Sequence, residues 1–105
     1  MTQPLLTHTS AAVAAIFLEN TRLERYGLEL VNGAGSTKGT IYPLLIEWER
    51  RGWLASRWEN DGELAKREEP GSRRRYYSIT DAGTRELTHY LARWEERRKG
   101  RRAIV

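Results

Sequence analysis

Apolar residues recur at helical spacing in two parts of this chain. Four of them between Ile41 and Trp48 stand at i, i+3, i+4 and i+7, and four more between Leu87 and Trp94 repeat the spacing. Side chains at these intervals share one face of an α-helix. We therefore expect two amphipathic helices, one in the middle of the chain and one at its end.

The middle helix begins at polar residues and ends at a glycine. Ser36 or Thr37 can cap its start, and Gly52 is placed to be the C′ residue. Pro43 has no N–H, and inside a running helix its ring would press on the carbonyl four residues earlier. The helix either bends there or begins its regular part near Thr40. We favour a start near Thr37 with a small distortion.

Two shorter helices precede it. The first is expected from Ala11 to about Asn20, capped by Thr9 or Ser10, and the second from Tyr26 to Asn32. The segment Gly33-Ala34-Gly35 then breaks the pattern, because two glycines around one alanine favour a turn.

A β-hairpin follows the middle helix. Residues 53–58 and 73–79 read as its two strands, and residues 60–72 read as a long tip because they hold the turn signals Asp61-Gly62 and Pro70-Gly71. Side chains alternate between the two faces of a strand. If Ile79 points to the core, Tyr77 does too, and Tyr76 is the freer ring.

The order helix, helix, helix, strand, strand, helix is that of a winged helix-turn-helix. The expected fold is mainly α with a small β-hairpin. We expect a flexible N-terminus (1–9), a winged-helix DNA-binding domain (10–80), a C-terminal dimerisation helix (81–99) that Thr80 caps, and a basic tail (100–105).

Composition adds a basic balance. The chain has 105 residues, a net charge of +4 and no cysteine. It can form one domain, without disulfides or thiolate metal sites. No stretch approaches the ~20 apolar residues that a membrane span needs, so we expect a cytoplasmic protein with no membrane contact.

The start of the middle helix is the first candidate for DNA contact. Hydroxyl groups and the backbone N–H groups of a helix start bind phosphate, and a lysine reaches a guanine edge or a phosphate. Ordinary capping would explain Ser36 or Thr37 alone, but not a lysine, a threonine and a tyrosine beside them. The expected contact residues are Ser36, Thr37, Lys38, Gly39, Thr40 and Tyr42.

The return strand carries the second candidate. Arg73, Arg74 and Arg75 form a basic cluster beside the hairpin tip, and Tyr76 follows them. Arginines on such a wing neutralise phosphates or enter the minor groove. Because the tip itself is rich in Asp and Glu, we expect it to stay off the phosphates.

The apolar stripe of the last helix has no later element to pack against. It is a candidate subunit interface, and the alternative is that it folds back on the first helix. Trp94 could line that interface or a ligand pocket within it. The residues expected at the dimer interface are Val13, Phe17, Leu87, Tyr90, Leu91 and Trp94.

Catalysis is not expected. His8 and His89 are isolated, and no carboxylate pair with a histidine, metal-ligand motif or phosphate-binding glycine loop is present. We therefore expect no catalytic residue, no metal and no cofactor.

The chain resembles the PadR-like transcriptional regulators. The resemblance rests on Gly39-Thr40-Ile41-Tyr42-Pro43-Leu44-Leu45, on Glu49-Arg50-Arg51-Gly52-Trp53-Leu54 and on Arg75-Tyr76-Tyr77-Ser78-Ile79-Thr80-Asp81-Ala82-Gly83. It implies a homodimeric repressor on a roughly palindromic operator in double-stranded DNA, released by a small aromatic effector, with Trp94 facing the dimer centre. Lys38 and the long acidic hairpin tip depart from the family pattern.

A second function stays open at this point. The same fold could be a protein-interaction module without specific DNA binding, its basic face meeting an acidic partner. The acidic hairpin tip and the apolar stripe around Trp94 motivate this alternative.

Overall fold

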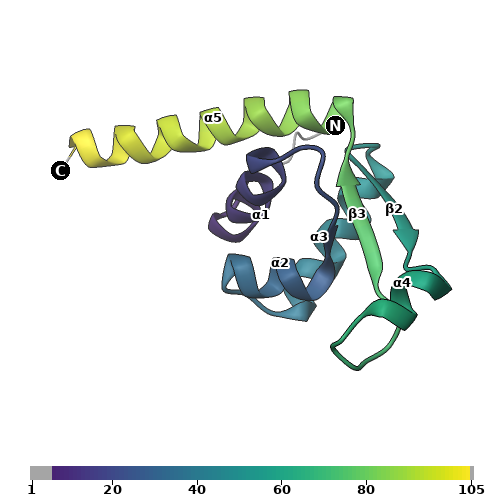
Figure 1. Ribbon diagram of the computed structural model, residues 1–105. Coiled ribbons are helices and arrows are strands. Elements are labelled where there is room, and N and C mark those ends of the chain that lie inside the picture. The colour runs from purple at the N-terminus through teal and green to yellow at the C-terminus, as the bar shows by residue number, and fades with distance from the viewer. Residues whose placement is uncertain (1–5, 105) are drawn as a thin grey trace.

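The computed structural model describes residues 6–104 of the chain, with side chains through residue 100. This part of the chain forms five helices and three strands (Figure 1). Their order is α1 (His8–Glu19), β1 (Arg25–Tyr26), α2 (Gly27–Ala34), α3 (Lys38–Arg50), β2 (Leu54–Trp58), α4 (Asp61–Lys66), β3 (Arg75–Ile79) and α5 (Asp81–Ile104). The predicted winged helix-turn-helix is confirmed, with two additions: β1 and α4.

The three strands form one antiparallel sheet in the order β1-β3-β2. In its register Ser56 lies opposite Tyr77, and Trp58 lies opposite Arg75. Tyr77 and Ile79 are buried while Tyr76 is only half-buried, as the alternation predicted. Strand β1 has only two residues, too few to show an alternating pattern in the sequence.

The core lies between the first three helices, the sheet and the first half of α5. Phe17, Leu30, Ile41, Leu45 and Leu87 are completely buried within it. Figure 1 shows α5 crossing above α1 and running on beyond it toward the C-terminus. None of the helices described is both long and apolar enough to cross a membrane.

Helix α1 begins earlier than predicted. Thr7, rather than Thr9 or Ser10, is its cap: the Ser10 N–H donates to Thr7 Oγ1 (3.1 Å), and the Thr7 N–H donates to Ser10 Oγ (2.7 Å). This reciprocal pair satisfies two N–H groups of the helix start. Leu6 is also buried. The expected flexible N-terminus is therefore wrong for residues 6–9, and its first five residues lie outside the described part.

The hairpin tip holds a short helix where the sequence predicted only turns. Asn60 caps α4 by accepting from the Glu63 N–H (2.8 Å), while Glu63 accepts from the Asn60 N–H (2.9 Å). The turn signal Asp61-Gly62 thus lies in the first turn of a helix. A capping box outweighed the preference of these two residues for a turn.

The ends of α3 and α5 meet at one hydrogen-bonded junction. Gly52 follows α3 with a φ of 77°, as a C′ residue requires. Thr80 Oγ1 donates to the Gly52 carbonyl (2.6 Å) and accepts from the Gly83 N–H (3.0 Å), so it caps α5 as predicted. Helix α3 itself runs without a break through Pro43. Helix α5 extends to Ile104, past the predicted end at Lys99.

Candidate nucleic-acid interface

The start of α3 is open to an incoming anion. Thr37 occupies the N-cap position, but no side chain caps the helix, because the Thr37 hydroxyl donates instead to the Thr40 hydroxyl (3.3 Å). Residues 37–40 are all exposed. Uncapped N–H groups at the positive end of a helix dipole attract phosphate oxygens.

Tyr42 is held in place one turn further along α3. Its ring lies against the backbone of Gly27, the first residue of α2, where a Cβ atom would collide with the ring. Because Gly27 has no side chain, the ring packs against the start of α2 while remaining 40% exposed. Two helices thus fix the direction in which the Tyr42 hydroxyl points.

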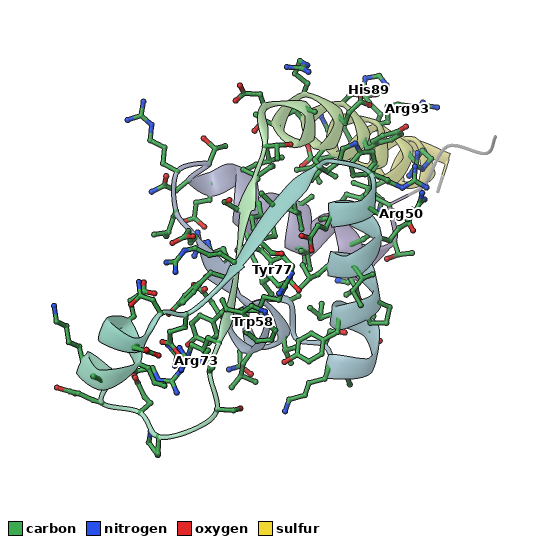
Figure 2. All side chains as sticks on the ribbon, turned by 90° about the vertical axis from the view of Figure 1, so that its right-hand side faces the viewer. Arg50, Trp58, Arg73, Tyr77, His89 and Arg93 are labelled. Atoms are coloured by element: carbon green, nitrogen blue, oxygen red, sulfur yellow. The ribbon has the colours of Figure 1, made fainter. Side chains whose placement is uncertain are left out.

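A groove of about 470 Å³ separates α3 from the wing, which we define as β2, residues 59–74 and β3. Every charged residue that lines it is basic: Lys38, Arg67, Arg73, Arg74 and Arg75. Figure 2 shows Arg73 toward the end of the molecule remote from His89 and Arg93 on α5, with Trp58 between them. A concave surface lined by one sign of charge concentrates ligands of the opposite sign.

The groove also exposes apolar side chains. Leu28 and Tyr42 are partly exposed, and Ile46 and Trp58 are 64% and 57% exposed. Sequence reasoning did not identify Ile46 or Trp58 as site residues. The signal for Ile46 was its position beside the buried stripe of α3, where a polar residue is expected.

Arg73 has acceptors within the wing. It donates to the Glu59 carbonyl (2.7 Å) and to the Asp61 carboxylate (2.8 Å). The Asp61 side chain is 96% exposed, so water screens this ion pair strongly. A phosphate can therefore replace Asp61 at little cost.

Arg74 and Arg75 lie over aromatic rings. The Arg74 guanidinium is 3.9 Å from the centre of the Tyr26 ring, and that of Arg75 is 4.9 Å from the Trp58 ring. Each also has a carboxylate 3.9 Å away, from Glu69 and Glu49 respectively. Cation–π contacts hold both groups at the groove without removing their charge.

A buried ion pair gives the wing its shape. Glu59 and Arg67, whose side chains are 1% and 7% exposed, meet at 3.0 Å. Glu59 also accepts from the Arg74 N–H (3.1 Å), and Arg67 donates to three backbone carbonyls of residues 69–72. The pair therefore fixes the path of the chain that leads into the arginine cluster.

A second ion network fixes the outer face of the wing. Arg57 donates to both oxygens of Glu24 and to both oxygens of Glu63, all at 2.8 Å. The hydrogen bonds from Arg57 lower the pKa of Glu63 to about 2, helped by the Asn60 N–H. The Glu63 carboxylate therefore remains charged at neutral pH and ties α4 to β2.

The structure brings together Lys38, Tyr42 and the three arginines of the predicted DNA contacts. Ser36, Thr37, Gly39 and Thr40 sit at the adjoining helix start but do not line the groove. Tyr76 lies on the other side of the sheet from Tyr77, with Arg57 5.0 Å over its ring and Tyr26 against its edge. It is thus packed within the wing, away from the groove.

Four of the residues predicted at the dimer interface are buried within the subunit. Val13, Phe17 and Leu87 are completely buried and Tyr90 is 7% exposed, because the first half of α5 folds back on α1. Val13, Phe17 and Leu87 have no surface left for a partner, so their assignment to a dimer interface is wrong, whereas Tyr90 keeps a small exposed edge and its assignment stays a prediction. Leu91 and Trp94 are only half-buried and retain such surface.

Trp94 borders a second hollow of about 340 Å³. The His8 ring centre is 6.1 Å from the Trp94 ring centre, and the Arg98 guanidinium is 4.7 Å from it. Leu6, Thr7 and Arg97 complete the lining. A tryptophan beside two arginines suits a planar ring that carries negative charge.

These elements define a winged-helix protein whose third helix and wing enclose a basic groove. Residues 20–89 match the transcriptional regulator PadR-like family. The chain belongs to this family, as its sequence motifs predicted, and the family is one of transcriptional regulators.

Solved structures agree with this assignment. A PadR family transcriptional regulator from Eggerthella lenta is 30% identical, with a TM-score of 0.66 over 91% of this chain and 83% of that one. The Bacillus subtilis PadR solved in complex with operator DNA is 21% identical, with a TM-score of 0.56 over 75% of this chain and 46% of that one, and shares the fold. A comparison with curated protein sequences finds no match.

Proposed function

We propose that this chain is a sequence-specific DNA-binding regulator that acts as a dimeric repressor on a palindromic operator. The observation that carries the proposal is the groove between α3 and the wing, in which all five charged lining residues are basic and which adjoins an uncapped helix start. A surface of this kind fits the phosphates and the major groove of a duplex.

The residues divide into two roles. Lys38 and Tyr42 reach base edges from the first turns of α3, because they are exposed and lie at the helix end that enters the groove of DNA. Arg73, Arg74 and Arg75 bind the DNA phosphates beside that groove. In a dimer on a palindrome the two copies of α3 would lie ~34 Å apart, about one turn of DNA.

A fluorescence anisotropy titration tests the proposal. The labelled duplex is the region upstream of the gene, compared with a scrambled duplex at several salt concentrations. We expect the affinity to fall steeply with salt for both, because phosphates release counterions, and a large excess of affinity for the upstream duplex. Equal affinity for both duplexes at every salt concentration would exclude a specific regulator.

Variants then separate the two roles. Lys38→Ala and Tyr42→Phe should reduce the difference between the duplexes, whereas Arg75→Ala should weaken binding to both alike. Arg93→Ala is the matched control, since Arg93 is an exposed arginine on α5 at the opposite end of the molecule from Arg73 (Figure 2). If the base-edge and backbone variants behaved alike, the division of roles would be wrong.

The dimer and its effector form a second part of the proposal. Leu91 and Trp94 retain exposed surface on α5, and the hollow beside Trp94 would lie close to the partner subunit. We expect a dimer in analytical ultracentrifugation, and quenching of tryptophan fluorescence by 2-naphthoate that is lost in Trp94→Phe. A monomer at micromolar concentration would refute the dimer, and quenching that survives the substitution would place the ligand elsewhere.

A protein-interaction module is the second candidate. It is favoured by the acidic partners of the wing arginines, which reduce the positive charge the wing presents. Stable capture of an acidic protein, together with the absence of DNA binding at low salt, would support it over the regulator.

A further inference from the structure

The apolar side chains of the groove are not accounted for by phosphate binding. Four of the five large hydrophobic residues that the described part exposes line this groove, and Ile46 is the most exposed of them at 64%. Phosphates and cations need no apolar neighbours, so Ile46 points to an apolar group on the ligand.

Ile46 continues the row of residues proposed to read DNA. Lys38, Tyr42 and Ile46 stand at i, i+4 and i+8 on α3, which places them on one side of the helix, clear of the buried stripe. The row is ~12 Å long at 1.5 Å per residue. Since base pairs stack every ~3.4 Å, it spans roughly three to four of them.

The charge around the groove limits what can cover Ile46. All five charged lining residues are basic. Arg67 is paired with the buried Glu59, but the other four leave the groove positively charged, so a second copy of the same groove would be repelled. A polyanion fits, and in the major groove of DNA the apolar group that projects from a base pair is the 5-methyl group of thymine.

We propose that Ile46 is a specificity-determining residue that contacts the 5-methyl group of one thymine in each operator half-site. The inference rests on the proposed function and adds to it a base preference located three to four base pairs from the contact of Lys38. Trp58, exposed on the wing side of the same groove, gives the contact a second apolar wall.

Replacement of thymine by deoxyuridine tests this inference, because it removes the methyl group and nothing else. A high-affinity duplex is first selected from a random library, and each thymine is then replaced in turn. For the wild-type chain we expect one position per half-site at which the replacement weakens binding about fourfold, the value of one buried methyl group. At the other thymines we expect no change.

Two variants complete the experiment. Ile46→Ala should bind the thymine and deoxyuridine duplexes equally, and its exposed position means that folding is preserved. Leu23→Ala is the matched control: among the described residues, Leu23 is the exposed large hydrophobic side chain that lies outside the groove, so its variant should keep the fourfold ratio.

The outcomes separate this inference from the proposed function. A selected duplex that tolerates deoxyuridine at every position, or an Ile46→Ala variant that keeps the wild-type ratio, overturns the thymine contact and leaves the regulator intact. A selection that enriches no sequence overturns the proposed function and the thymine contact with it.

Discussion

Replacing Arg67 by alanine should open the wing while the rest of the fold stays intact. The Arg67 guanidinium donates to the Glu59 carboxylate and to the carbonyls of Glu69, Gly71 and Ser72. The substitution removes all four bonds. The Glu59 carboxylate, whose side chain is only 1% exposed, then accepts a single hydrogen bond, from the Arg74 backbone N–H.

The cost is dominated by that carboxylate. Removing one partner of a buried ion pair typically costs about 3–5 kcal/mol, because the other charge stays out of water. The three carbonyls belong to exposed residues and can be hydrated, so they add little. Glu59 can regain water if residues 60–74 detach. Opening of this segment therefore limits the loss, and we expect about 3 kcal/mol, the lower end.

Hydrogen exchange measured by NMR detects this opening directly. A loss of about 3 kcal/mol raises the exchange rate of amides in the wing roughly a hundredfold, whereas amides of α1 and α3 should change far less. The Arg74 amide is the most informative, since it donates to Glu59. Affinity for DNA should fall for all sequences, because the arginine cluster loses its fixed position.

A matched control separates this effect from loss of a positive charge. Arg73→Ala removes an arginine from the same segment but leaves the buried Glu59 carboxylate paired. It loses an exposed ion pair with Asp61, worth about 0–1 kcal/mol, and one hydrogen bond to the Glu59 carbonyl, worth about 1 kcal/mol. Wing amides should therefore lose much less protection than in Arg67→Ala. Equal exchange in the two variants, or a change below threefold in Arg67→Ala, would refute the role assigned to the buried pair.

Three further outcomes are expected. Gly27→Ala should push the Tyr42 ring away from α2, so DNA affinity should fall severalfold while the midpoint of urea unfolding hardly moves. Gly83→Ala should destabilise the whole domain by about 1–3 kcal/mol or more, seen as a lower melting temperature, because its Cβ would collide with the Trp53 carbonyl. The pKa of Glu63 is lowered to about 2, so its stabilising effect is complete above the ordinary value of 4.5 and is lost as the pH falls toward 2. Exchange of wing amides should accelerate over that interval, and the acceleration should be smaller in Glu63→Gln, which lacks the titrating group. An unchanged Tyr42 ring environment in NMR would contradict the first expectation, and a wild-type melting temperature of Gly83→Ala would contradict the second. A Glu63 carboxyl that titrates near 4.5 would contradict the third.

The sequence was sufficient to predict the helices and strands that carry the core residues. Ile41, Leu45 and Trp48 are buried as their spacing predicted, and Gly52 and Thr80 end α3 and begin α5. These features depend on residues near one another in the chain, where periodicity and capping chemistry are direct signals.

The partners of the wing arginines could not be read from the sequence. The carboxylate that pairs with Arg75 belongs to Glu49 on α3. The ring that packs against Arg74 belongs to Tyr26 on β1. Neither pairing leaves a local pattern, because tertiary packing creates it. The same limit applies to Val13 on α1 and Leu87 on α5. Their burial became evident only when the path of α5, which packs on α1, was known.

These partners also change what the arginine cluster means. Three adjacent cations repel one another, and carboxylates with rings hold them apart. An exposed pair such as that of Arg73 and Asp61 contributes little stability, whereas a bidentate bond to phosphate is among the strongest that an arginine forms. DNA can therefore displace the carboxylate without unfolding the wing. Because each displaced carboxylate regains its own cations, the salt dependence of binding should be weaker than the number of basic residues alone would predict.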